Sequence, residues 1–297
     1  RRLALDQPRS FARIPPPEPR PPLEARPRQL SVTQIETWMR DPYSIFARHI
    51  LKLRPLDPLE ADPGAADRGT FIHAALDMFV RAYPDAVPPD ALDRLLGFGQ
   101  DAFGPALSQP AVWAFWWPRF ERIAAWVIDA EHRRRPSLRA SHSEQSGRLV
   151  IDGPEGTFTL TAKADRIDQL ADGGFEIIDY KTGVAPSKDD VGLGFAPQLP
   201  LEAAIAESGG FADIPADMVT AMTYWVLSGG ATPGRESKVA VEGDERSRAD
   251  EALDGLRQLV ASFDDLSTPY SAIPRPSRAP RFNDYAHLSR RLEWGVE

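Results

Sequence analysis

Apolar residues recur along the chain with two spacings, one typical of helices and one typical of strands. Between residues 67 and 83 they fall at i, i+3, i+4, i+7 and i+8, which predicts an amphipathic helix with one buried face. The positions on this face are Ile72, Ala75, Leu76, Phe79 and Val80. The capping-box sequence Ser31-Val-Thr-Gln34 predicts the start of a short helix that runs to about residue 40. Further helices are predicted at about residues 43–51, 90–104, 111–134, 195–207 and 248–266.

Shorter apolar segments in the middle of the chain have strand character. They cover residues 147–151, 157–167, 175–180, 219–227 and 238–241. The turn sequences Asp152-Gly153-Pro154 and Asp172-Gly173-Gly174 separate the first three of them. Strands that alternate with helices in this order predict an α/β fold, in which helices flank both sides of a mixed central β-sheet.

The first part of the chain differs from the rest. Residues 14–28 are rich in proline and predict an extended linker. The start, Arg1-Arg2-Leu3, has no Met and no signal-peptide pattern, which indicates a piece of a longer protein. We therefore expect residues 1–29 to be a linker from a missing upstream region and residues 30–297 to form one domain.

Composition excludes several classes of protein and site. No apolar run approaches the roughly 18–20 residues of a membrane helix. The 297 residues include no cysteine, which excludes disulfides, thiolate zinc sites, cysteine-ligated iron–sulfur clusters and a cysteine nucleophile within this chain. These features are typical of a cytoplasmic globular protein.

The net charge of −8 is distributed unevenly along the chain. Residues 1–54 hold 11 Lys or Arg and 5 Asp or Glu, and residues 271–291 hold 5 Arg and one Asp, whereas residues 55–270 hold 19 basic and 35 acidic residues. Local potential steers a polyanion more than total charge does, so basic ends are compatible with a nucleic-acid partner. The alternative is that these arginines are solvated surface.

The candidate chemistry lies in the strands predicted on either side of residue 172. Asp179 and Lys181 alternate with apolar residues and so point to the same face of their strand. A turn centred on residue 172 places Asp165 opposite Asp179, and a turn centred on residue 173 places it opposite Lys181. An intermediate register would turn Asp165 to the other face. Clustered carboxylates repel each other unless a cation lies between them, which predicts Mg²⁺ or Mn²⁺; the alternative is a salt-bridged hairpin.

These residues belong to a series of motifs. Asp165, Asp179 and Lys181, in Ala-Asp-Arg-Ile-Asp and Ile-Ile-Asp-Tyr-Lys-Thr-Gly, resemble the D…DYK signature of the RecB-type branch of the PD-(D/E)XK nucleases. Arg68-Gly-Thr-Phe-Ile-His73 resembles the GxxxH helix of that branch, and Gln198-Leu resembles its Q-L motif. The resemblance implies a restriction-endonuclease-like core with helical additions, and hydrolysis of DNA by a metal-activated water. It further implies that Asp165, Asp179 and His73 bind the metal, Lys181 acts on the nucleophile and Gln198 positions the substrate.

Two further motifs, Leu30-Ser-Val-Thr-Gln-Ile-Glu-Thr37 near the start and Asn283-Asp-Tyr-Ala-His-Leu288 near the end, extend the resemblance over residues 30–297. Together they look like the C-terminal nuclease domain of the AddB family of the alphaproteobacterial type. That family implies an upstream helicase-like region, the AddA helicase–nuclease as partner, and exonuclease action on single-stranded DNA or duplex ends during double-strand break resection and recombinational repair. Many relatives hold an iron–sulfur cluster with four cysteines, but Asp41 stands at the first of these positions here, so we expect packing in place of a cluster. The family's Tyr after the Q-L motif is also missing, with Leu201-Glu202 there instead.

Other residues carry two interpretations each. Glu144 either supplies a further carboxylate to the site or is an ordinary residue at a strand start, and Tyr180 is either core or a DNA-backbone contact. Lys163 and Arg166 either neutralise phosphates or are strand-face charges. The aromatic group at residues 113–117 either stacks on bases, forms a subunit interface or packs in the core.

Arg133-Arg134-Arg135 is expected to be a solvated helix end. Two other functions remain open from the sequence alone. One is a catalytically silent scaffold that binds DNA and the helicase partner, and the other is a stand-alone Cas4-like exonuclease.

Overall fold

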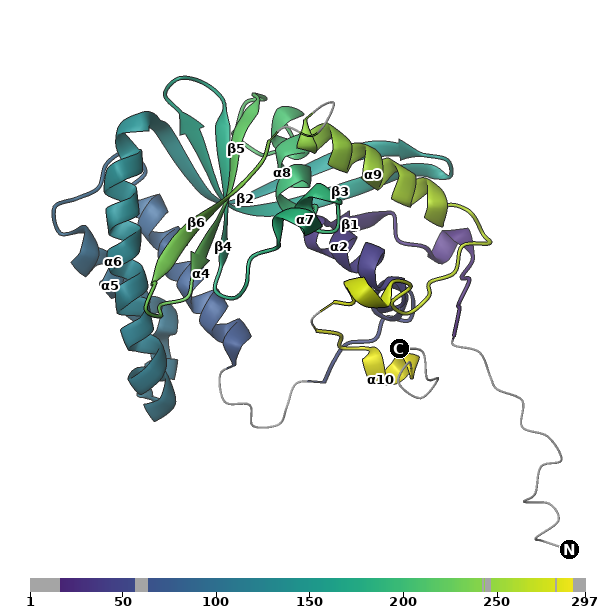
Figure 1. Cartoon of the computed structure of the whole chain (residues 1–297), viewed down its shortest axis with the longest axis horizontal. Helices are drawn as coiled ribbons and strands as arrows, with labels where there is room; N and C mark the ends of the chain where they lie inside the picture. Colours follow the sequence, from purple (N-terminus) through teal and green to yellow (C-terminus); the bar gives the residue numbers. More distant parts are fainter. Residues whose placement is uncertain (1–16, 57–63, 242, 244–246, 281, 291–297) are drawn as a thin grey trace, which may run out of the picture. The chain divides into compact units, whose positions relative to one another are not determined.

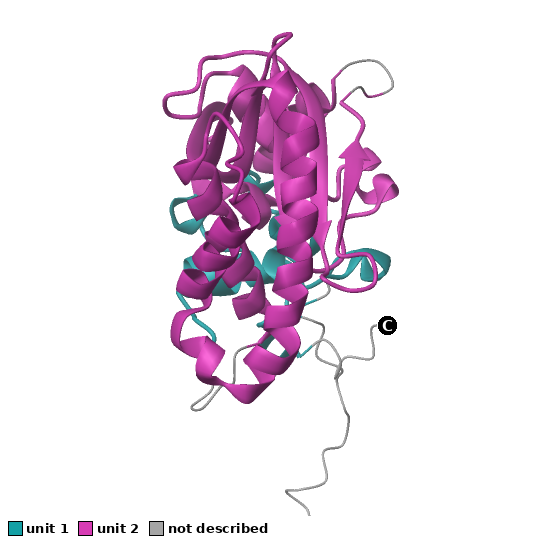
Figure 2. Ribbon diagram, turned by 90° about the vertical axis from the view of Figure 1, so that its left-hand side faces the viewer, with its two compact units in different colours: residues 1–27, 37–55, 263–297 teal, residues 28–36, 56–262 magenta. Residues whose placement is uncertain are grey.

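The computed structural model describes residues 17–56, 64–241, 243, 247–280 and 282–290. The chain divides into two compact units, coloured separately in Figure 2. Unit 1 contains residues 1–27, 37–55 and 263–297, and unit 2 contains residues 28–36 and 56–262. All of the candidate site residues lie in unit 2.

The described part of unit 2 is built on a six-stranded mixed sheet flanked by helices, as the sequence predicted (Figure 1). Its strands are β1 (Gln29–Ser31), β2 (Leu138–Gly153), β3 (Gly156–Leu170), β4 (Phe175–Lys181), β5 (Val219–Leu227) and β6 (Gly234–Val239). Strand β3 pairs antiparallel with β2 along most of its length, and with both β1 (parallel) and β4 (antiparallel). Strand β5 is parallel to β4 and antiparallel to β6.

The register of β3 and β4 resolves the alternatives that the sequence left open. Arg166 pairs with Ile178 and Ile167 with Ile177, so the turn is centred on residue 172. Continuing this register by one position places Asp165 opposite Asp179. The turn also requires glycine, because Gly174 has φ +78° and a Cβ there would lie 2.8 Å from a backbone oxygen.

The helices of unit 2 bury the predicted apolar faces. Helices α4 (Ala65–Ala82), α5 (Ala91–Phe103) and α6 (Trp117–Arg134) lie together at the left of Figure 1 and share one core with residues of β4 and β5. The buried residues of α4 are those predicted, namely Ile72, Ala75, Leu76, Phe79 and Val80. Helix α8 (Gln198–Glu207) packs on β4 and β5.

Several boundaries differ from the predictions. Strand β2 begins at Leu138 rather than at residue 147. Its first half is polar and lacks the apolar alternation from which a strand is predicted, and it is a strand because it pairs with β3. Strand β6 lies earlier than predicted, and the short helix α7 (Lys188–Gly192) and strand β1 were not predicted. The helix predicted at 111–134 begins with a π-helical turn, η4 (Val112–Trp116).

The described residues of unit 1 contain short helices and no strand. They include α3 (Pro42–Ile45), the π-helical turn η2 (Phe46–Ile50) in the segment predicted as one helix, and α10 (Ala286–Ser289). The buried carboxylate of Asp41 accepts hydrogen bonds from the Asn283 side chain (2.9 Å), the Ile273 backbone N–H (3.1 Å) and the Ser44 hydroxyl. A polar network thus joins the segment 37–55 to the segment 263–297.

The remaining described elements are distributed over both units. They are η1 (Leu23–Ala25), α2 (Val32–Arg40), η3 (Gly104–Ser108), η5 (Arg135–Ser137), α9 (Arg248–Phe263) and η6 (Pro276–Arg278).

Among the helices that the structure describes, none combines the length and the apolar character needed to cross a membrane.

Candidate active site

The end of β4 and the start of α8 form a closed polar network. The ammonium of Lys181 donates to Asp179 Oδ1 at 2.9 Å and contacts Oδ2 at 2.7 Å. It also donates to Gln198 Oε1 at 3.1 Å, and Gln198 Nε2 donates back to Asp179. Alternation of side chains along the strand explains the arrangement. Ile178 and Tyr180 face the helical core. Asp179 and Lys181 point the other way and reach Gln198 on α8. The structure therefore brings together three of the residues that the motifs singled out.

Asp165 links this network to α4. Its Oδ2 accepts a hydrogen bond of 2.8 Å from the backbone N–H of Tyr180, and its Oδ1 lies 3.3 Å from His73 Nδ1. The helix packs tightly at Gly69, where a Cβ would lie 3.1 Å from the Thr182 hydroxyl and would have to displace it slightly. A glycine four residues before the histidine thus suits the close packing of α4 beside the end of β4.

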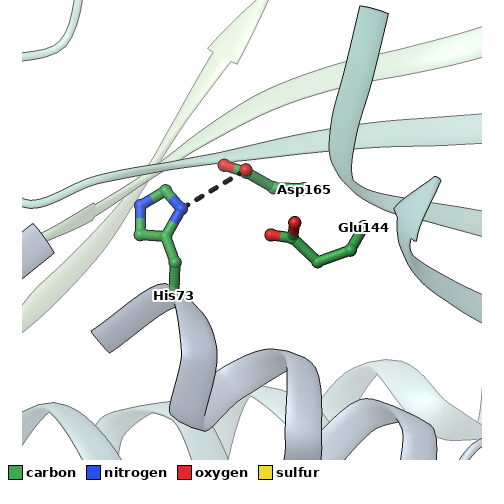
Figure 3. A group of neighbouring side chains, drawn as sticks. All are labelled: His73, Glu144 and Asp165. Atoms are coloured by element: carbon green, nitrogen blue, oxygen red, sulfur yellow. Dashed lines mark ion pairs between the residues drawn. The ribbon is translucent and has the colours of Figure 1, made fainter. Parts of the chain in front are cut away.

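Glu144 completes a second group of side chains. One ligand atom from each of His73, Glu144 and Asp165 lies within 4.8 Å of the other two, and the three side chains converge from α4, β2 and β3 (Figure 3). The pairs on either side, Ser143 with Arg166 and Gln145 with Ala164, place Glu144 opposite Asp165. Glu144 has φ +52°, a conformation that is rare and strained for a residue other than glycine. Its carboxylate also forms an ion pair with Lys163.

Burial and charge shift the protonation of these groups. Burial raises the pKa of Asp179 to about 6, against the opposing charge of Lys181 and with the charge of Asp165 in support. Burial lowers the pKa of Lys181, but the charge and hydrogen bond of Asp179 outweigh it and raise that pKa above its ordinary value. For His73, the hydrogen bond and charge of Asp165 likewise outweigh burial and raise the pKa. A buried carboxyl group such as Asp179, which resists ionisation beside a second carboxylate, is typical of a site that gains by taking up a cation.

The sequence did not reveal Glu202 as part of this site. It is 1% exposed, and its Oε1 accepts a hydrogen bond of 3.2 Å from Gln198 Nε2. Its Oε2 is buried without a hydrogen-bond partner in the described structure. Burial, followed by the charges of Asp179 and Asp165, raises the pKa of Glu202 well above its ordinary value. Its position four residues after Gln198, on the same face of a helix, was the available signal.

The donor set fits a divalent cation. Carboxylate oxygens and one imidazole nitrogen are ligands that Mg²⁺ or Mn²⁺ accepts. A cation beside Asp165 would also lower the cost of ionising Asp179 and Glu202, which are otherwise buried acids. The residues that could hold it are His73, Glu144 and Asp165, with Asp179 across the strand pair.

Two predicted roles are corrected by the structure. Arg166 is 1% exposed and forms ion pairs with Glu131 and Asp168, so it is neither a phosphate contact nor a strand-face charge. Arg134 and Arg135 are not solvated either. Arg134 bonds Asp168 and Glu176 at 2.8 Å each, and Arg135 bonds Glu131 at 2.6 Å. The positive charges of Arg134 and Arg135, at the C-terminal end of α6, therefore belong to a buried ionic network and are not solvated.

The aromatic residues divide between core and surface. Tyr180 is 4% exposed and packs against His73 and Trp225, with ring centroids at 5.6 and 5.7 Å, which favours its role in the core. Trp117 is buried in the helical core, whereas Trp113 is 56% and Phe115 68% exposed.

Comparison with known proteins gives consistent results. Residues 29–278 match the family model described as the PD-(D/E)XK nuclease superfamily. The chain is 31% identical over 185 residues to an uncharacterized protein of Rickettsia bellii, covering 62% of this chain and 22% of that protein. It is 30% identical over 206 residues to an ATP-dependent helicase/deoxyribonuclease subunit of Moorella thermoacetica, covering 60% of this chain and 18% of that protein. The chain thus spans about a fifth of the length of the curated relatives it matches.

Proposed function

The chain belongs to the PD-(D/E)XK nuclease superfamily, and from this premise we propose that it hydrolyses phosphodiester bonds in DNA with the help of Mg²⁺ or Mn²⁺. The observation that carries the proposal is the convergence of Asp165, Asp179 and His73 beside the ammonium of Lys181. A nuclease of this kind needs acidic ligands and one cationic donor at the same point. Asp165 in β3 and Asp179 at the end of β4 would be the ligands, and Lys181 would be the donor.

The proposed role of each side chain in hydrolysis depends on its charge. When bound, the divalent ion would supply an activated water and neutralise charge on the scissile phosphate. Asp165, Asp179 and His73 would hold it, and Glu144 would assist. The raised pKa of Lys181 keeps its amine protonated at neutral pH, so it acts as a hydrogen-bond donor that orients the water and offsets negative charge. Gln198 holds that ammonium from the α8 side and would position an incoming substrate group.

We further propose that this is the nuclease domain of an AddB-type subunit of a helicase–nuclease complex in the cytoplasm. The named relative from Moorella supports this assignment, as do the motifs at Leu30–Thr37 and Asn283–Leu288. The partner would be the AddA helicase–nuclease, and the substrate single-stranded DNA or duplex ends during end resection for recombinational repair. Residues 1–29 would then connect to an upstream helicase-like region.

A cleavage assay tests the hydrolytic proposal. Labelled single-stranded DNA is incubated with Mg²⁺ and the parent chain or its Lys181→Ala variant, and we expect a loss of about 10²–10³-fold, the usual effect of removing one transition-state donor. Lys238→Ala, an exposed lysine on β6, is the matched control and should cleave like the parent. EDTA should abolish cleavage. Equal activity of the parent and Lys181→Ala would refute the mechanism and favour a DNA-binding scaffold.

A further inference from the structure

The ammonium of Lys163 is bound to one of the side chains that could hold the cation. It forms an ion pair with the carboxylate of Glu144, which points toward His73 and Asp165 in Figure 3. The Glu144 side chain is 16% exposed and that of Lys163 is 64% exposed, so the pair joins a largely buried acid to a solvent-facing amine. Lys163 thus supplies a positive charge at the edge of the group of candidate ligands.

The register of β2 and β3 explains why Lys163 reaches this group. Lys163 pairs with Ser146, and Glu144 lies two residues before Ser146 on the same face of the strand pair. Asp165 lies two residues after Lys163 and therefore also on that face. A diagonal neighbour on the adjacent strand is within reach of a long side chain. The sheet fixes the backbone of Lys163, whereas its flexible four-carbon stem lets the ammonium reach more than one position.

Lys163 and a bound divalent cation would compete for the carboxylate of Glu144. Like charges a few ångströms apart repel strongly, whereas an ion pair with an exposed lysine stabilises only weakly. The favourable position of the Lys163 ammonium beside a bound cation is therefore away from Glu144, toward solvent. There it can meet a negative group that the metal-free protein leaves to water.

A groove along the same two strands begins next to Lys163. It has a volume of about 640 Å³, and its lining includes Ser146, which pairs with Lys163, and Arg148 and Thr161, which pair with each other two residues further along. Among the described residues that line it, Arg148 carries the only charge. Hydroxyl groups and cations are the side chains that contact the phosphates of a nucleic acid. A backbone phosphate at the Lys163 end of this groove would lie between the candidate metal site and Arg148.

We propose that Lys163 couples the binding of the cation to the binding of DNA. Its ammonium pairs with Glu144 in the metal-free protein and moves to a backbone phosphate of DNA when Glu144 binds the cation. The coupling rests on the proposed nuclease function and adds a form of regulation to it, since the protein binds DNA more tightly once the cation is present. Coupling of this kind is reciprocal, so DNA also raises the affinity for the cation.

Fluorescence anisotropy of a labelled single strand with phosphorothioate links, which resist hydrolysis, tests the coupling. Lys163→Gln is compared with the parent in EDTA and in saturating Mn²⁺, and Lys238→Gln, at an exposed lysine of β6, is the matched control. In Mn²⁺ we expect Lys163→Gln to raise the Kd about fivefold at about 0.1 M salt and to reduce the slope of log Kd against log salt by about 0.7, the effect of one phosphate contact. In EDTA, where Lys163 stays on Glu144, the Kd of Lys163→Gln should equal that of the parent. Lys163→Arg, which keeps the charge, should restore the tighter binding in Mn²⁺.

Calorimetry without DNA measures the other side of the exchange. Lys163→Gln removes the competitor for Glu144 and should tighten the binding of Mn²⁺ by about 1.5- to 5-fold, the range of one exposed ion pair. The substitution thus strengthens the binding of one ligand and weakens that of the other, which general damage to the fold would not do.

Two results would overturn the coupling and leave the nuclease function standing, provided that the parent cleaves ordinary DNA. One is an equal loss of DNA affinity in EDTA and in Mn²⁺, which would make Lys163 an ordinary surface charge. The other is parental affinity of Lys163→Gln for both ligands. If the coupling is observed but the parent leaves DNA with ordinary phosphodiester links intact in Mn²⁺, the hydrolytic function fails and the coupling stands. A parent that binds no Mn²⁺ overturns both.

Discussion

Replacing Arg166 with methionine removes the central charge of a buried ionic network beneath the candidate site. Its Nε donates to Asp168 at 2.7 Å, and its terminal nitrogens bond Glu131 and, at 3.3 Å, the hydroxyl of Ser141. Both carboxylate side chains are 0% exposed. Methionine keeps an unbranched apolar stem of similar reach but supplies neither the charge nor the donors.

The expected loss of stability follows from the charges that remain after the substitution. Asp168 keeps one cation, Arg134 at 2.8 Å, and Glu131 keeps Arg135 at 2.6 Å, so the pocket gains one uncompensated negative charge. Removing one partner of a buried ion pair costs about 3–5 kcal/mol. At about 2–4 °C per kcal/mol for a domain of this size, the Tm should fall by roughly 6–20 °C. A typical domain stability of about 5–15 kcal/mol means that the variant should still fold.

Thermal unfolding followed by far-UV circular dichroism measures the effect. Arg94→Met is the matched control, because Arg94 pairs with Asp90 at a similar 2.8 Å but is 56% exposed. An exposed pair of this kind contributes little to stability, because water screens both charges. Adding Glu131→Gln to Arg166→Met should recover part of the loss by removing the stranded charge. Equal Tm values for Arg166→Met and Arg94→Met would refute the reasoning.

Three further predictions concern the metal site and the helix start. Affinity for Mn²⁺ should rise with pH through about 6, because burial raises the pKa of Asp179 to about 6 and its proton must leave before a cation binds; equal calorimetric affinities at pH 5.5 and 7.5 would contradict this. Glu202→Gln should raise the Tm of the metal-free protein at pH 8 by roughly 2–4 °C, the shift that 1 kcal/mol produces. Since the folded-state pKa of Glu202 is raised, its stabilising contribution is present at low pH and lost as pH rises, so the gain should vanish near pH 4; a gain independent of pH would be the contrary result. Ser31→Ala should cost about 1 kcal/mol in urea unfolding, because Ser31 Oγ accepts from the Gln34 N–H at 3.3 Å and Gln34 Oε1 accepts from the Ser31 N–H at 2.9 Å; Ser31→Thr, which keeps the hydroxyl, should lose less than Ser31→Ala.

Local periodicity predicted those features that depend on neighbouring residues alone. The apolar spacing between residues 67 and 83 predicted the buried face of α4, and alternation at the end of β4 predicted that Asp179 and Lys181 share a face. The capping box at Ser31 also formed as predicted. For Asp165, the sequence could narrow the register to a few alternatives, and the chain adopts the one whose turn is centred on residue 172.

Features that depend on segments far apart in the sequence could not be predicted from local periodicity. The first half of β2 is polar, and only its long pairing with β3 makes it a strand. The same pairing places Glu144 opposite Asp165, with a backbone conformation that its residue type does not favour. Arg166 is charged and stands in a strand that alternates, yet the carboxylate of Glu131, 35 residues away, determines that it is buried. Glu202 was missed because a lone glutamate in an apolar helix has no motif to identify it.

The proposed mechanism depends on one divalent ion that is shared by the carboxylates of Asp165, within β3, and Asp179, near the end of β4. Anomalous diffraction from crystals soaked in Mn²⁺ tests this dependence most directly. We expect a peak about 2.1 Å from an oxygen of Asp165 and an oxygen of Asp179, with His73 or Glu144 as a further ligand and the ammonium of Lys181 beside it. A peak bound elsewhere, or no peak at Mn²⁺ concentrations that support cleavage, would contradict the mechanism.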